Sequence, residues 1–185
     1  MRPIYVEIDD RMRSYARVLA KERPIEKTST NDEDGYIGSL GQLAWYKLRY
    51  GETGWWEHRN QGGAGEPDDM SDEGPIEVKS SQVRNMETAH LMVKEYYALH
   101  NSPAFYILVL FDEAEKDGDE RIAYVCGWGT HKQVLAGKFR TGKSSKTGKP
   151  WGYYCYCVPR RELHKIIDLP FEIALLKKGR RAANF

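Results

Sequence analysis

Residues 66–81 read Glu-Pro-Asp-Asp-Met-Ser-Asp-Glu-Gly-Pro-Ile-Glu-Val-Lys-Ser-Ser. The turn-forming residues Ser, Asp, Glu and Gly occupy positions 71–74, and polar and apolar residues alternate after them. Turn-forming residues between two short segments of this kind predict a strand, a turn and a second strand. We therefore expect a β-hairpin here.

The second strand of this hairpin carries two charged residues at alternate positions. Glu77 and Lys79 are two residues apart, so their side chains leave the same face of the strand. Ile76 and Val78 point to the other face, where they can enter a hydrophobic core. A strand that buries one face and presents an acid and a base together on the other is a suitable platform for a functional site.

The first strand supplies a further acid, and the position of the turn determines which one. If the turn is centred between Asp72 and Glu73, Asp68 lies across from Glu77. A turn shifted by one residue would place Asp69 there instead. We prefer Asp68 and keep Asp69 as the alternative.

Two carboxylates that converge across a hairpin repel each other unless a cation lies between them. Mg²⁺ binds through few carboxylates and retains waters, so Asp68 or Asp69 together with Glu77 would hold it, and the Val78 backbone carbonyl would add an oxygen. We expect Mn²⁺ to substitute for Mg²⁺. Such an ion lowers the pKa of a bound water and neutralises charge on a phosphodiester, and Lys79 would stabilise the transition state.

These residues resemble the PD-(D/E)xK nuclease superfamily, which includes many restriction endonucleases, phage exonucleases and archaeal Holliday-junction resolvases. The matching features are Pro67-Asp68, the eight-residue gap, Glu77-Val78-Lys79 and the trailing Ser80-Ser81. The family also places its motif on the second and third strands after an initial helix, and the resemblance covers roughly residues 36–111. It implies a restriction endonuclease-like core and metal-dependent DNA cleavage.

One position departs from the family pattern. Members often carry a glutamate on the first helix in a Gly-x-x-Gly-Glu pattern, whereas this chain has Gly38-Ser-Leu-Gly-Gln42. Gln42 has no negative charge, so we expect it to support the site by a hydrogen bond to a metal-bound water. The departure fits a one-metal enzyme, a site completed by Glu57 or Glu66, or a degenerate fold that only binds.

The flanking sequence predicts further elements from its apolar periodicity. We expect helices at 7–22, 36–49, 90–100 (at least from Lys94) and 134–136, strands at 55–58, 104–111, 121–128 and 151–158, and helices at 161–167 and 171–178. Together they predict an α/β fold with a central mixed β-sheet flanked by helices, in the order α-β-β-β-α-β, with N- and C-terminal additions. At 185 residues we expect one domain, made of a helical extension (1–33), a core (36–128) and a basic part (130–185).

Composition describes an ordinary globular chain, with 41% hydrophobic and 30% charged residues. The longest apolar run, 104–111, is about a third of a membrane span, so we expect no membrane partner. Three cysteines give no disulfide framework, which favours a reducing, cytoplasmic compartment. Charge is uneven: from Thr130 onward thirteen Lys and Arg face three acids, whereas residues 1–129 hold 24 acids and 15 basic residues.

The basic part contains a Gly- and Ser-rich segment that suits phosphate contacts. Its candidate nucleic-acid-binding residues are Lys138, Arg140, Lys143, Lys146 and Lys149. The aromatic residues that follow, at 151–156, would be able to stack on unpaired bases. A solvated loop beside an ordinary aromatic strand explains the same pattern equally well.

Two other motifs are set aside. Residues 137–144 match the phosphate-loop pattern G-x-x-x-x-G-K-S, but no strand-like run precedes them and Gly148 and Pro150 prevent a regular helix afterwards, so we expect no nucleoside triphosphate partner. Cys155 and Cys157, with His164 and Cys126, lack the spacing of a zinc site and are predicted to be core residues.

The sequence therefore predicts a Mg²⁺-dependent DNA nuclease in which Asp68 or Asp69, Glu77 and Lys79 act on the phosphodiester. It leaves endonuclease and exonuclease activity open, as well as monomer and homodimer. The alternatives are a nuclease-like fold that binds nucleic acid without cutting it, and an interaction protein of a phage or mobile element.

Overall fold

The computed structural model describes residues 2–22, 32–62, 66–114, 119–142, 150 and 152–176. Its helices are α1 (Asp10–Glu22), α2 (Asp32–Tyr50), α3 (Gly54–His58), α4 (Glu95–His100) and α5 (His131–Leu135), with 3₁₀ turns at Met86–Thr88, Arg160–Glu162 and Ile166–Asp168. Its strands are β1 (Ile4–Glu7), β2 (Asp69–Ser71), β3 (Gly74–Val83), β4 (His90–Lys94), β5 (Phe105–Asp112), β6 (Ile122–Thr130), β7 (Lys138–Arg140) and β8 (Cys155–Pro159).

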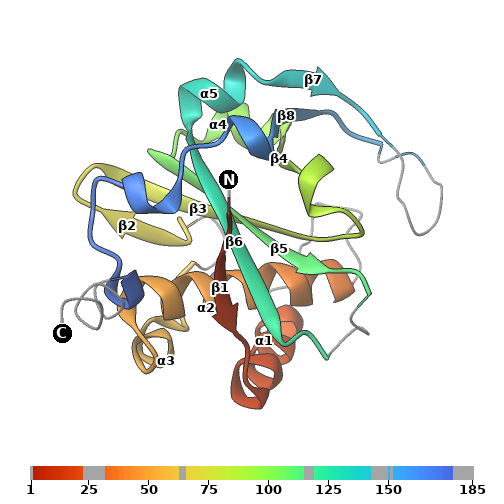
Figure 1. Cartoon of the computed structure of the whole chain (residues 1–185). Helices are drawn as coiled ribbons and strands as arrows, with labels where there is room; N and C mark the ends of the chain where they lie inside the picture. The colour runs from red at the N-terminus through yellow and green to blue at the C-terminus, as the bar shows by residue number, and fades with distance from the viewer. Residues whose placement is uncertain are drawn as a thin grey trace.

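Two sheets organise the described part of the chain. The larger has the order β1-β6-β5-β3-β2, in which β3 and β5 run parallel and the other pairs are antiparallel. The smaller is antiparallel with the order β4-β8-β7. Helices α1 to α3 cover one side of the larger sheet, and the smaller sheet with α4 and α5 lies on the other (Figure 1). The expected class, an α/β protein with a mixed sheet and flanking helices, is confirmed.

Strand β5 lies at the centre of the larger sheet and is buried on both faces, which explains its uninterrupted apolar sequence. Its odd-numbered residues, Phe105, Ile107, Val109 and Phe111, join the core beneath the helices. Its even-numbered residues, Tyr106, Leu108 and Leu110, join a second core beneath the smaller sheet. The fold therefore has two cores separated by one sheet.

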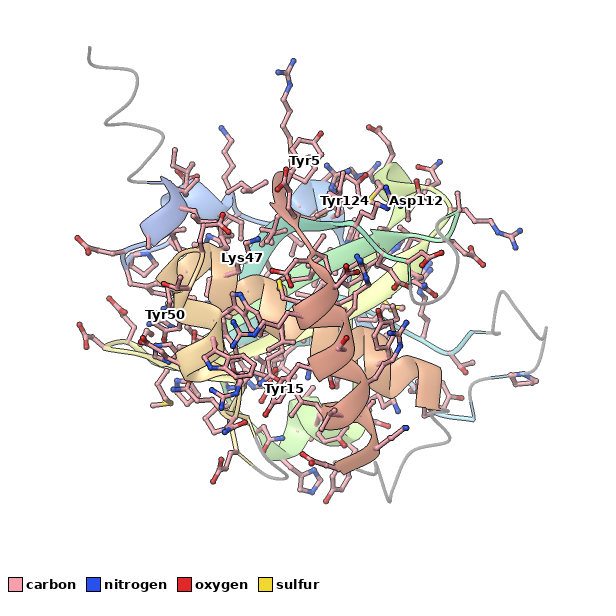
Figure 2. All side chains as sticks on the ribbon, turned by 90° about the horizontal axis from the view of Figure 1, so that it is seen from below. Tyr5, Tyr15, Lys47, Tyr50, Asp112 and Tyr124 are labelled. Carbon is pink, nitrogen blue, oxygen red and sulfur yellow. The ribbon has the colours of Figure 1, made fainter. Side chains whose placement is uncertain are left out.

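Helix α2 is apolar around most of its surface because it lies between α1 and the larger sheet. Figure 2 views this side, with α1 in front. Helix α2 approaches the sheet closely at Gly41, where an added Cβ would overlap the Ser80 hydroxyl and stand 2.7 Å from the Ser80 Cβ. The missing side chain lets the helix sit directly on β3, which brings the next residue, Gln42, to the hairpin.

The sequence prediction was wrong in three segments. Residues 55–58 form helix α3 rather than a strand, because the two apolar residues Trp55 and Trp56 are too short a run to distinguish the two. Gly51 (φ 97°) redirects the chain, and α3 packs on α2. Residues 90–94 form β4 rather than a helix, since Leu91 and Val93 alternate with partly exposed neighbours.

The helix expected at 161–167 is also absent. Short 3₁₀ turns and extended residues occupy this region, and Leu169 precedes Pro170, which disfavours helical backbone. Of the helix expected at 171–178, residues 174–176 are helical and 177–178 lie outside the described residues.

Candidate active site

The β2–β3 hairpin has the register that the sequence predicted. Asp69 pairs with Ile76 and Ser71 pairs with Gly74, so the turn is centred between Asp72 and Glu73. Asp68 lies one step before β2 and therefore opposite Glu77.

Asp68 is held in this position from two sides. Its Oδ2 atom accepts a hydrogen bond from the backbone N–H of Val78 at 2.7 Å. Its backbone carbonyl accepts a hydrogen bond from the Tyr46 hydroxyl of α2. The side chain is thus anchored to β3 and the main chain to α2, which fixes a carboxylate at the start of the hairpin.

Glu77 and Lys79 form an ion pair on the face of β3 that points to the smaller sheet. Lys79 Nζ donates to Glu77 Oε2 at 2.7 Å, and the two side chains are 28% and 21% exposed. Burial works to lower the pKa of Lys79, but the carboxylates of Glu77 and Asp68 outweigh it and raise that pKa above its ordinary value. The lysine is therefore a stable ammonium group that lies in the field of both acids.

Gln42 contributes from α2. It is buried, and its Nε2 donates to the Tyr46 hydroxyl at 2.7 Å and to the Gln61 carbonyl at 3.0 Å. An added Cβ at Gly62 would overlap Gln42 Nε2 and stand 3.0 Å from Asp68 Oδ1. The amide and the Asp68 carboxylate thus border the same small space.

Asp69, the alternative acid, is placed elsewhere. Its Oδ2 accepts from Trp45 Nε1 at 2.7 Å and from Arg49, while its Oδ1 accepts from the Tyr50 hydroxyl at 2.7 Å and the Met70 N–H at 2.8 Å. The residue is 3% exposed. These donors use both oxygens, so Asp69 fastens the hairpin to α2, and we do not retain it as a metal ligand.

Neither of the other two acids considered from the sequence joins the cluster. Glu57 on α3 and Glu66 before the hairpin are both exposed. In the described part of the chain, no three His, Cys, Asp or Glu residues gather as a metal-binding group. The acids at this position are therefore Asp68 and Glu77.

Tyr106 and His131 lie next to the cluster and were not predicted from the sequence. Tyr106 pairs with Glu77 across the parallel β3–β5 ladder. Burial raises the pKa of Tyr106 to about 12, with Lys79 lowering it and Glu77 raising it, and its hydroxyl is 3.2 Å from His131 Nδ1. No local pattern indicates these residues, because their proximity depends on strand pairing between distant segments.

Of the predicted nucleic-acid-binding residues, Lys138 and Arg140 lie on β7, an edge strand of the smaller sheet. Lys143, Lys146 and Lys149 lie outside the described residues. Since the middle of the phosphate-loop string, at 138–140, is a β-strand, that motif has the wrong backbone for a phosphate loop.

The three cysteines are buried, as predicted for core residues. Burial raises the pKa of both Cys126 and Cys155 to about 11, so these two are neutral thiols at physiological pH. His164 packs on Trp128, with ring centroids 4.4 Å apart.

Gly62 offers a test of how closely the site is packed. Both Gly62 (φ 75°) and Gly152 (φ 71°) have left-handed backbone, but a Cβ at Gly152 would meet no atom within 4 Å. We expect Gly62→Ala and Gly152→Ala each to lower the free energy of unfolding by about 1–2 kcal/mol from backbone strain. Only Gly62→Ala should also displace Gln42 and Asp68 and impair the metal-dependent DNA cleavage that the sequence predicts.

Urea denaturation and an activity assay on both variants provide the measurement. Equal activity losses per folded molecule in the two variants would contradict the close packing inferred around Gly62.

Comparisons of the chain with protein-family models, curated proteins and solved structures gave no match. Within the described residues, no helix combines the length and the apolar character needed to cross a membrane. The fold and the site thus define a mixed α/β protein with an Asp…Glu-x-Lys cluster on a β-hairpin.

Proposed function

We propose that this chain is a Mg²⁺-dependent DNA nuclease of the PD-(D/E)xK type. The observation that carries the proposal is the position of Lys79: its ammonium group is bonded to Glu77 and lies in the field of Asp68, across one hairpin. An acid pair and a lysine are the groups that metal-assisted phosphodiester hydrolysis requires.

The donor set fits a hard divalent cation. Asp68 and Glu77 would hold it through carboxylate oxygens, and two carboxylates suit Mg²⁺, which keeps several waters. The Val78 N–H points to Asp68, and in a strand the carbonyl of a residue leaves the same edge as its N–H, so this carbonyl is a third candidate ligand. When bound, the cation supplies a water of lowered pKa and charge neutralisation at the phosphate.

The chain's own residues have separable roles in this proposal. Lys79 has three N–H donors, one of which Glu77 engages, so the others can orient the attacking water and stabilise negative charge on the phosphate. Gln42 stands beside Asp68 and would orient its carboxylate or a water next to it. Tyr106 lines the same face and would exclude solvent from the ion pair.

Gln42 also supports a second candidate function, binding without cleavage. It adds no negative charge where the resembling nucleases often have glutamate, and its amide already donates to Tyr46 and Gln61. A site weakened in this way would leave a nucleic-acid-binding protein of nuclease-like fold.

A cleavage assay separates the two candidates. Supercoiled plasmid, linear duplex and single-stranded DNA are incubated with the protein in Mg²⁺, Mn²⁺ or EDTA. We expect metal-dependent cleavage that Glu77→Gln reduces by at least about 100-fold. The matched control is Glu73→Gln, an exposed acid in the same hairpin, which should cleave at the wild-type rate.

Wild-type protein that is inert in both metals but retards DNA on a gel would favour binding without cleavage. Protein that neither cleaves nor retards DNA would refute both candidates.

A further inference from the structure

The outer edge of the smaller sheet carries an exposed pair of stacked aromatic rings. Phe139 of β7 and Tyr154, which immediately precedes β8, have ring centroids 5.0 Å apart and planes inclined by 11°. They are 45% and 50% exposed. Tyr156 lies 5.1 Å from Phe139 and is partly buried against the second core, so the pair is anchored on one side and open on the other.

This exposure is concentrated in one layer of the molecule. Of the nine large hydrophobic residues that are exposed in the described part of the chain, five belong to the smaller sheet and the helices beside it: Tyr96, Leu99, Leu135, Phe139 and Tyr154. Exposed apolar surface that is contiguous marks interaction sites more often than single exposed residues do, and Phe139 and Tyr154 are in contact with each other.

Cations border the aromatic pair. The three strands of the smaller sheet contain no acidic residue. Lys138 and Arg140 flank Phe139 on β7, and Lys94 on β4 shares a sheet face with Arg140 because both pair with Cys155. The edge strand thus presents an aromatic ring on one face and positive charge on the other.

We infer that this surface, which extends around the β7 edge of the sheet from the aromatic face to the basic face and which we call the β7 platform (Phe139, Tyr154, Lys138, Arg140 and Lys94), binds single-stranded DNA. Bases stack on the aromatic pair while Lys138 and Arg140 contact the phosphates. An exposed aromatic ring can stack only on an unpaired base, because the bases of a duplex are already stacked on one another. Proteins that bind single strands combine such aromatic residues with a basic groove.

The inference rests on the proposed nuclease function and names its substrate class, DNA that contains unpaired nucleotides. Strand β7 lies on the side of the larger sheet opposite the helices α1 to α3 (Figure 1). Glu77 and Lys79 point to this side as well, because Glu77 pairs with Tyr106 of the second core. One DNA molecule could then bind the β7 platform through its unpaired nucleotides and place a phosphodiester at Asp68 and Glu77.

The test measures binding in EDTA, where no metal-dependent cleavage can occur. Fluorescence anisotropy compares a labelled oligodeoxythymidylate with a blunt duplex of equal length. We expect tighter binding of the single strand, and at least about a tenfold loss of that affinity in the double variant Phe139→Ala/Tyr154→Ala. The variant Phe139→Trp/Tyr154→Trp should retain the affinity, because it keeps flat rings at both positions.

The matched control is Tyr5→Ala. Tyr5 is 64% exposed and packs edge-on against Tyr124, 5.4 Å away (Figure 2), on an edge strand of the other sheet. Its loss should leave binding unchanged. A second double variant, Lys138→Ala/Arg140→Ala, should lose two phosphate contacts. The magnitude of the slope of log affinity against log salt concentration should therefore fall by about 1.4, which is about 0.7 for each phosphate contact on a single strand.

Three results would overturn the inference: equal affinity for single strand and duplex, unchanged binding in the alanine double variant, or a homodimer in sedimentation that this variant dissociates. The nuclease proposal is tested separately by cleavage of plasmid and linear duplex. Cleavage with unchanged binding in the double variant refutes the β7 platform alone, whereas platform-dependent binding with no cleavage of any DNA refutes the nuclease alone.

Discussion

Lys79→Met is expected to abolish metal-dependent DNA cleavage while leaving the fold intact. Methionine keeps an unbranched apolar stem like that of lysine but removes the ammonium group that Glu77 and Asp68 hold. Loss of one positioned donor to the developing charge reduces the rate by about 10²- to 10³-fold. The side chain is partly exposed, so its replacement should cost little stability.

The rate of plasmid cleavage, urea denaturation and a gel shift are measured on the same preparations. Lys132→Met, an exposed lysine on α5, is the matched control and should behave as wild type in all three. A Lys79→Met protein that is folded and still cleaves at the wild-type rate would contradict the assignment of Lys79 as a catalytic residue.

Asp69→Asn is expected to destabilise the protein rather than to affect chemistry directly. The Asp69 carboxylate and Arg49 form an ion pair in which the side chains are 2% and 11% exposed. Breaking a buried pair leaves an uncompensated charge and costs about 3–5 kcal/mol of unfolding free energy. The hydrogen bonds from Trp45 and Tyr50 would also be disturbed.

The matched comparison uses Asp72→Asn, an exposed acid in the turn of the same hairpin, which should change stability by less than about 0.5 kcal/mol. Asp68→Asn should show the opposite profile to Asp69→Asn, with loss of cleavage and a smaller change in stability. If Asp69→Asn abolishes cleavage at unchanged stability, the roles that the structure indicates for these two neighbouring acids are exchanged.

The hairpin could be predicted from the sequence because its determinants are local. Turn residues at 71–74 set the register, and strict alternation through Ile76 and Val78 set the buried face. The central strand at Phe105–Asp112 was equally clear, because a run of apolar residues bounded by polar ones fits a strand buried on both faces.

The turn position favoured Asp68 over Asp69 as the acid opposite Glu77, but the structural role of Asp69 could not be predicted from local pattern. Both are acids at the start of one strand, and what separates them is the presence of donors on α2, some 20 residues earlier in the chain. The sequence indicates that α2 exists, but it does not indicate which of its residues meets the hairpin.

The smaller sheet was missed for a related reason. Strand β4 pairs with β8, which lies more than sixty residues later. Because the short run His90–Lys94 leads directly into helix α4, the sequence pattern did not separate the strand from that helix. Position 106 was recognised as part of a buried strand, but its neighbour at Glu77 follows from the parallel pairing of β3 with β5. Local periodicity does not encode such long-range pairings.

The cation site is tested most directly by soaking crystals of the protein in Mn²⁺ and recording anomalous diffraction. We predict a peak between the carboxylates of Asp68 and Glu77, which is lost in crystals of Glu77→Gln and retained in those of Glu73→Gln. Anomalous density that is absent from this position in fully soaked wild-type crystals, or that lies instead against Asp69, would contradict the proposed site.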